Sequence, residues 1–134
     1  IPIPRFLIAA CVLIAALPSS VIAQTRTDET LLARGEYVLQ ISGCSHCHTA
    51  ESGEQLAGGR ALTTPFGTFY TPTNFHKTAG IGAWSVGEFQ RALHQGVAPD
   101  GSDYYPAFPY TSYTRILAED ARALHAYILS LPAS

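Results

Sequence analysis

Residues 43–48 read Gly-Cys-Ser-His-Cys-His, and this short stretch decides how the rest of the chain is interpreted. Cys44 and Cys47 are three residues apart, and His48 follows at once, so two thiols and an imidazole lie close together on the backbone. The third cysteine, Cys11, belongs to an apolar segment far upstream. Cys44, Cys47 and His48 are therefore taken together as one candidate site, which does not include Cys11.

Three kinds of site use the pattern C-x-x-C-H: covalent haem attachment, a zinc site and a thiol redox pair. In the first, Cys44 and Cys47 add to the two vinyl groups of a porphyrin, and His48 becomes the proximal ligand of the iron. A zinc site needs a second ligand pair, yet the other histidines beyond the motif are scattered singly. A thiol redox pair goes with alternating strands and helices, which this sequence does not suggest. We therefore predict one covalent haem c, with the other two kinds of site as alternatives.

Apolar spacing predicts three helices, over residues 28–41, 85–96 and 118–129. Between them, residues 49–77 and 97–113 are rich in glycine, proline, threonine and tyrosine and predict extended loops. Long loops in a small domain need a surface to pack on, and a flat porphyrin would supply one. No strand pattern or internal repeat is evident, so the expected class is all-α.

The ends of these helices carry recognisable signals. Thr27 or Asp28 is the expected N-cap of the first helix, and Gly43 lies just past its end. Ser85 and Glu88 form the spacing of a capping box at the start of the second helix. These signals support the predicted boundaries.

The N-terminal segment has the residue pattern of a targeting signal. Arg5 precedes an uncharged apolar run, and small residues lead up to Gln24, which is the order of a secretory signal. We expect residues 1–23 to be a signal peptide or a retained membrane anchor, and residues 24–134 to be the folded domain. A lipid on Cys11 is a third possibility. The position of Arg5 favours the periplasmic side of the bacterial inner membrane for the domain.

The charge balance excludes one class of partner. The chain has 8 Lys or Arg and 10 Asp or Glu, with a net charge of −2, and one of the cations is Arg5 in the leader. No basic stripe exists to follow a phosphate backbone, so nucleic acid is not an expected partner.

With the motif in place, the chain resembles class I cytochromes c, and in particular the cytochrome c subunits of membrane-bound periplasmic dehydrogenases. Besides the motif, the matching stretches are Arg34-Gly35-Glu36-Tyr37, Leu56-Ala57-Gly58-Gly59-Arg60, Thr64-Pro65-Phe66-Gly67, Gly80-Ile81-Gly82-Ala83-Trp84 and Tyr105-Pro106-Ala107-Phe108-Pro109-Tyr110-Thr111-Ser112-Tyr113. They cover nearly everything from Leu31 to Leu131. The resemblance implies a cytochrome c-like fold, about three helices and long loops around one haem.

The resemblance also implies roles for single residues. The first and last helices would cross, with Gly35 allowing close approach and Tyr37 and Tyr127 near the crossing. The loop around Asn74 and Trp84 would line the haem edge. The simpler expectation for these aromatic residues is packing in the core.

The sequence departs from the resemblance at the sixth ligand of the iron. Relatives usually supply a methionine from the loop before the last helix, but this chain has no methionine. The positions where it would be sought hold Tyr105, Phe108 and Ile116. The candidates for a replacement ligand are His94 and Tyr105, with His76 as a further one; otherwise the iron is five-coordinate or takes a ligand from another chain. Ordinary surface exposure is the simpler expectation for His76, His94 and His125.

The resemblance implies a single-electron carrier between a dehydrogenase, or another membrane complex, and a downstream acceptor. We expect an electron-transfer protein or a subunit of an oxidoreductase complex, with redox proteins as partners, membrane contact through the N-terminal helix and no substrate chemistry on this chain. The alternative is a haem-based ligand-binding sensor or a peroxidase-like enzyme with an open distal site. The missing methionine motivates this alternative.

Overall fold

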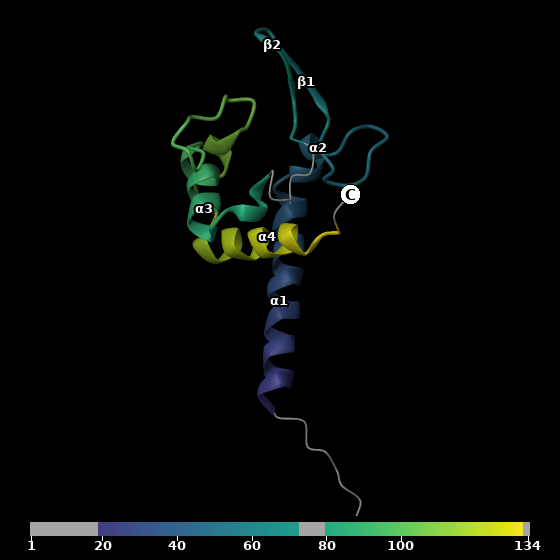
Figure 1. Ribbon diagram of the computed structural model, residues 1–134, viewed down its shortest axis with the longest axis vertical. Helices are drawn as coiled ribbons and strands as arrows, with labels where there is room; N and C mark the ends of the chain where they lie inside the picture. The colour runs from purple at the N-terminus through teal and green to yellow at the C-terminus, as the bar shows by residue number, and fades with distance from the viewer. Residues whose placement is uncertain (1–18, 73–79, 133–134) are drawn as a thin grey trace, which may run out of the picture.

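Helices form most of the framework in this computed structural model, which describes residues 19–72 and 80–132, with side chains from residue 28 onward. The four α-helices are α1 (Ser19–Ile41), α2 (Cys44–His48), α3 (Val86–Gln95) and α4 (Ala118–Ser130), and two short 3₁₀ helices are η1 (Ile81–Ala83) and η2 (Tyr110–Ser112). Two strands, β1 (Ala61–Thr64) and β2 (Gly67–Tyr70), complete the elements of the described residues. In Figure 1, α4 lies across the long helix α1, with α3 to one side and the two strands at the opposite end from the start of α1.

The packing of α4 against α1 is the most extensive contact between helices in the described residues. Gly35 of α1 is buried at this crossing, where a Cβ atom would collide with the carbonyl oxygen of Ala123 and lie 2.5 Å from the Cβ of Tyr127. The expected role of Gly35, and the position of Tyr127 beside it, are therefore confirmed. Tyr37 is 52% exposed, and its ring lies under the guanidinium group of Arg34.

An ion pair joins the same two helices at the surface. Arg34 donates two hydrogen bonds to the Asp120 carboxylate, from Nε at 2.7 Å and from the guanidinium NH₂ at 2.9 Å. This pair holds the pKa of Asp120 below its ordinary value. Because the pair is exposed, the crossing depends mainly on the close backbone contact at Gly35.

The apolar core lies where α1, α3 and α4 converge. Its members are buried side chains from these helices, from the loop after α2 and from η1: Val38, Leu39, Leu56, Ile81, Phe89, Leu93, Ala121, Leu124 and Ile128. Cys44, Trp84, Phe108 and Tyr113 are partly buried against this cluster. The core and the C-x-x-C-H motif thus share one region of the molecule.

The first helix ends as the sequence predicts but begins earlier. It stops at Ile41, and Gly43 follows with a φ of 70°, a left-handed conformation that glycine adopts easily. The expected N-cap at Thr27 or Asp28 is wrong, because α1 runs without interruption from Ser19. The predicted leader falls largely on residues 1–18, which lie outside the described residues. Among the helices that are described, none has both the length and the apolar character needed to cross a bilayer.

The other two predicted helices are confirmed. At the start of α3, the Ser85 amide donates to a Glu88 carboxylate oxygen at 2.7 Å, and the Glu88 amide donates to Ser85 Oγ at 3.2 Å, which completes the capping box. Gly96, with a φ of 69°, ends this helix. The last helix begins at Ala118, as expected.

The sequence analysis missed the two strands. β1 and β2 pair antiparallel, with Leu62 opposite Phe69 and Thr64 opposite Gly67, so only Pro65 and Phe66 form the turn. Thr64 Oγ1 accepts a hydrogen bond from the Phe66 amide at 3.2 Å and fixes this turn. The helical class is confirmed, with a small hairpin added to it.

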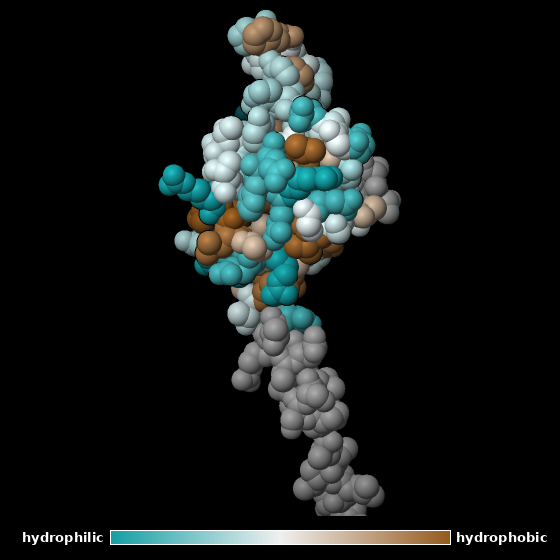
Figure 2. Space-filling view, turned by 90° about the vertical axis from the view of Figure 1, so that its left-hand side faces the viewer, coloured by the Kyte–Doolittle hydropathy of each residue, from teal (hydrophilic) through white to brown (hydrophobic). Residues whose placement is uncertain are grey.

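The hairpin carries exposed aromatic side chains. Phe66 is 82% exposed and Tyr70 is 71% exposed. Figure 2 shows a hydrophobic tip at the end of the molecule where the hairpin lies, above a largely hydrophilic middle. A two-stranded ribbon gains its stability from what it packs on, so the inward contacts of the hairpin matter for the site described below.

Replacing Gly35 by alanine is expected to lower the free energy of unfolding by about 1–3 kcal/mol, because the added methyl group overpacks the crossing. Thermal or urea unfolding of the two proteins at equal cofactor content measures the difference. The matched control is Gly87→Ala in α3, where the nearest atom to an added Cβ is Ser85 Oγ at 4.0 Å. The control should be neutral or up to about 1 kcal/mol more stable, since alanine favours a helix. Equal effects of the two changes would contradict this account.

His125 lies inside the fold and not on the surface. The expectation of an exposed side chain at this position is wrong, since His125 is 6% exposed on α4 and packs on Phe89 with ring centroids 5.0 Å apart. Its Nε2 has no hydrogen-bond partner among the described residues. Burial lowers the pKa of His125, and hydrogen bonds to the backbone of Trp84 and Ile81 act in the opposite direction. The folded state therefore prefers the neutral imidazole.

This preference predicts acid sensitivity. Because the pKa of His125 is lower in the folded state, its contribution to stability is complete above about pH 6.5 and declines as the pH falls below that value. Unfolding measured between pH 7.5 and 5 should show a shallower pH dependence in His125→Leu than in the parent protein. His46→Gln, at an exposed position, is the control. An unchanged slope in His125→Leu would refute the assignment.

Candidate functional site

The C-x-x-C-H motif forms its own short helix beside the end of α1. Gly43 reverses the chain after Ile41, and α2 begins at once with Cys44. The Ser42 amide donates to the Val38 carbonyl at 3.0 Å, and the His46 amide donates to the Gly43 carbonyl at 3.0 Å. These bonds fix the orientation of α2 relative to α1.

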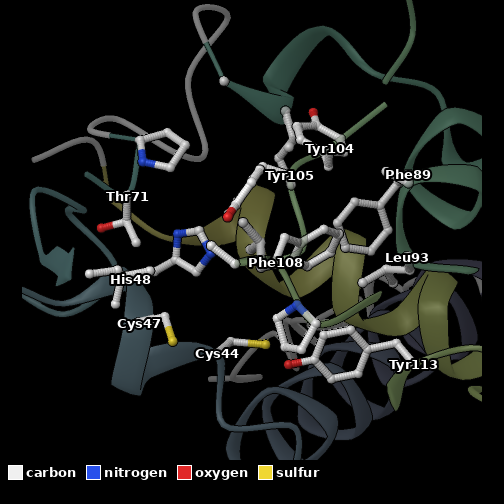
Figure 3. Close-up of a pocket in the computed structure, with 18 of the residues that line it drawn as sticks. Cys44, Cys47, His48, Thr71, Phe89, Leu93, Tyr104, Tyr105, Phe108 and Tyr113 are labelled. Carbon is white, nitrogen blue, oxygen red and sulfur yellow. The ribbon is translucent and has the colours of Figure 1, made fainter. Parts of the chain in front are cut away.

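A cavity of about 440 Å³ opens beside this short helix. Cys44, Cys47 and His48 line it together, and Figure 3 shows the His48 imidazole near the centre of the view with the two sulfur atoms below it. The intervening residue His46 is exposed. All three groups of the motif that can form bonds to a cofactor therefore face the same space.

The remaining described walls of the cavity are mostly apolar and come from the hairpin, η1 and its surroundings, α3, the loop before α4, and α4. They include Leu62, Phe69, Tyr70 and Thr71 from the hairpin and its end, Ile81 and Trp84 near η1, Phe89, Ala92 and Leu93 from α3, Tyr104, Tyr105, Ala107, Phe108, Pro109 and Tyr113 before α4, and Leu124 and Ile128 from α4. Its size lies within the usual range for cofactor and ligand sites. An apolar space of this size suits a large planar group.

Electrostatics distinguish between the uses of the two thiols. Burial raises the pKa of the Cys44 thiol to about 11, so that it stays protonated at neutral pH. A thiol redox pair needs the opposite shift, toward a reactive thiolate. Burial also lowers the pKa of His48, which favours the neutral imidazole, the form that binds a metal. Within the described ranges, no three His, Cys, Asp or Glu side chains come together to hold a metal ion by themselves. The site therefore favours covalent haem over either alternative.

The loop that follows the motif folds back onto it. The Gly58 amide donates to the His48 carbonyl at 2.8 Å, and the Leu56 amide donates to Thr49 Oγ1 at 3.0 Å. Leu56 is buried and has a φ of 63°, a left-handed conformation that is unusual for a branched side chain. The sequence analysis did not single out Leu56, since nothing local in the sequence marks such a backbone.

The contacts of two further residues of the site, Thr71 and Tyr113, were not predicted from the sequence. Thr71 is buried at the cavity wall, and its Oγ1 accepts a hydrogen bond from the Arg60 amide at 3.0 Å, which closes the base of the hairpin. Tyr113 donates a hydrogen bond from its hydroxyl to the Ser42 carbonyl at 3.0 Å, which ties the loop before α4 to the start of the motif. These bonds join segments far apart in the chain, so no local signal could have revealed them.

The structure brings some of the predicted site residues together and separates others. Trp84 and Tyr105 line the cavity, whereas His94 does not. His94 is partly buried, and its Nε2 lies 3.0 Å from the carbonyl oxygen of Ile116. It is therefore neither a residue of the cavity wall nor a fully exposed surface residue. Asn74, like His76, lies outside the described residues.

Several curated proteins are similar to this chain. It is 41% identical over 115 residues to the cytochrome c subunit of gluconate 2-dehydrogenase from Pantoea cypripedii, a match to 84% of this chain and 26% of that protein. It is 46% identical over 102 residues to a component of nicotinate dehydrogenase from Pseudomonas putida, covering 75% of this chain and 8% of that component. A protein of Cereibacter sphaeroides named diheme cytochrome c-type is 44% identical over 108 residues, covering 76% and 36%. The chain thus spans roughly a third or less of the length of these relatives.

The family model for cytochrome c matches residues 32–132. This range contains the motif, the walls of the cavity and the crossing of α1 with α4. Two of the relatives are named as cytochrome c subunits of dehydrogenases. Together, the model match and the relatives show that this chain belongs to the cytochrome c family, whose members bind haem c covalently.

Proposed function

We propose that this chain carries a single haem c, bound covalently by Cys44 and Cys47 and ligated by His48, and that it transfers single electrons for a dehydrogenase complex. The observation that carries the proposal is the position of the motif: two thiols and one imidazole face an apolar cavity of about 440 Å³. The zinc and thiol redox alternatives have no comparable support.

The residues of the site fit a haem in three ways. The thiols of Cys44 and Cys47 point to the cavity side by side from one turn of helix, as two thioether bonds to neighbouring vinyl groups require. The neutral imidazole of His48 would supply a nitrogen to the iron. When bound, the haem would supply an iron that alternates between ferrous and ferric states. The apolar side chains that line the cavity would exclude water from it.

The sequence supports one haem in this chain. C-x-x-C-H occurs once, and the third cysteine, Cys11, has no cysteine near it in the sequence. A relative is named diheme, but the chain covers only 36% of it. A second haem in that relative is compatible with a second domain that this sequence does not match.

The partner and location follow from the relatives and the N-terminal sequence. Three relatives are named as cytochrome subunits of gluconate, alcohol and fructose dehydrogenases, which supports a dehydrogenase as electron donor. The order of residues 1–23 supports export to the periplasmic side, with this segment as signal peptide or anchor, and residues 24–134 as the electron-transfer domain.

Removing both thiols tests the attachment. Cys44→Ala together with Cys47→Ala should yield a protein whose haem is extracted by acidified organic solvent, whereas the parent keeps its haem through denaturing gel electrophoresis. Both proteins are produced in a periplasm with a cytochrome c maturation system. His46→Ala, at an exposed position between the cysteines, is the control and should retain covalent haem. A parent protein without covalent haem would overturn the proposal.

Electron transfer is tested in the membranes of the source organism. Membranes that contain a tagged copy of the chain are supplied in turn with gluconate, an alcohol, fructose or nicotinate, and the absorption of the reduced haem is followed. We expect at least one dehydrogenase substrate to reduce this haem, and the same dehydrogenase to co-purify with the tag. Membranes that carry the double alanine variant are the control. A haem that no substrate reduces would argue against a dehydrogenase as donor.

A further inference from the structure

The described walls of the cavity offer the iron one protein ligand and no evident second one. The sequence contains no methionine. Among the described residues that line the cavity, the nitrogen and sulfur atoms of side chains belong to the motif itself and to Trp84, whose indole N–H donates hydrogen bonds and has no lone pair for a metal. His94 and His125 do not line the cavity.

Both of these histidines are also held elsewhere. The Nε2 atom of His94 lies 3.0 Å from the Ile116 carbonyl oxygen, and His94 does not line the cavity, whereas its neighbour Leu93 does. His125 is buried on α4 and packs on Phe89, which lines the cavity, whereas His125 itself does not. The structure therefore places neither histidine on the described cavity wall.

Several of the oxygen donors are held by other contacts, while Tyr70 also lines the cavity and is 71% exposed. The Tyr113 hydroxyl donates to the Ser42 carbonyl, and Thr71 Oγ1 is hydrogen-bonded to the backbone of Arg60. Tyr105 stacks on Phe69 of the hairpin with centroids 4.3 Å apart and planes 17° apart. Tyr105 is 41% exposed, but it lines the cavity, and Figure 3 shows its hydroxyl end on the side of the His48 imidazole, so Tyr105 is the competing ligand that the test must include.

Phe108 fills the interior on the same side of the cavity. Its ring lies 5.7 Å from that of Tyr104 and 5.9 Å from that of Tyr113, and it packs against the core cluster. Its amide donates to the Tyr105 carbonyl at 3.0 Å, which fixes the turn that presents it. In Figure 3 the His48 imidazole points into the cavity toward the region where Phe108 and Tyr105 lie. A benzyl side chain has no atom that can bind iron.

We propose that Phe108 covers the sixth coordination position of the haem iron without ligating it, so that this position is open to small neutral ligands such as carbon monoxide. The proposal rests on haem attachment at Cys44, Cys47 and His48. It concerns coordination and leaves the electron-transfer assignment as it stands. An apolar wall favours a neutral ligand over an anion, because an unpaired charge is costly to bury.

The test begins with the full chain carrying its covalent haem, so that a protein without covalent haem counts against the proposed function alone. We expect a high-spin ferrous spectrum that carbon monoxide converts completely to a low-spin one. Phe108→Met supplies a thioether at the covered position and should be low-spin without added ligand, with carbon monoxide affinity reduced at least about tenfold. Methionine ligation should also raise the reduction potential.

The matched control is Ile116→Met, which adds the same thioether to the same loop. Ile116 is partly buried but does not line the cavity, so its spectrum and carbon monoxide affinity should equal those of the parent. Phe108→Leu removes the ring without adding a donor and should still bind carbon monoxide. This variant keeps the test decisive if Phe108→Met does not fold.

Two outcomes would overturn the proposal. A parent protein that is low-spin and does not respond to carbon monoxide has a sixth ligand, and loss of that spectrum in Tyr105→Phe, His94→Ala or His76→Ala would identify it. Conversion to the low-spin form by Ile116→Met and not by Phe108→Met would show that Phe108 does not cover the iron.

Discussion

Helices α1 and α4 meet at Gly35 with no side chain between them, and most of the site depends on that contact. The position of α4 fixes α3, which packs against it, and so fixes the wall made by Phe89, Leu93 and Leu124. The position of α1 fixes α2, because only Ser42 and Gly43 separate the two helices. A change of spacing at one glycine would therefore move the motif relative to the wall that faces it.

The sequence predicted the parts of the fold that local chemistry controls. The Ser85–Glu88 capping box and Gly43 are signals between near neighbours, and both mark helix ends in the structure. The hairpin could have been found from the turn Thr64-Pro65-Phe66-Gly67 and the β-forming residues around it. It was missed because four-residue strands are too short for a clear alternation.

Other features could not have been read from the sequence, because they depend on contacts between distant segments. The burial of His125 follows from its packing against Phe89 of another helix. The bond from Tyr113 to Ser42 joins residues 71 positions apart. The motif itself shows the contrast: its chemistry was evident from five residues, whereas the wall opposite His48 is assembled from the hairpin, α3, α4 and the loop before α4.

Trp84 is the only tryptophan in the chain, and it lies on the cavity wall. The fluorescence of Trp84 would therefore report whether haem occupies the cavity, because haem quenches a nearby fluorophore by energy transfer. Protein without haem would show tryptophan fluorescence. In protein with haem this fluorescence would be quenched until local opening moves Trp84 away from the haem. Loading and local opening can thus be followed by fluorescence in the native sequence, without any attached label.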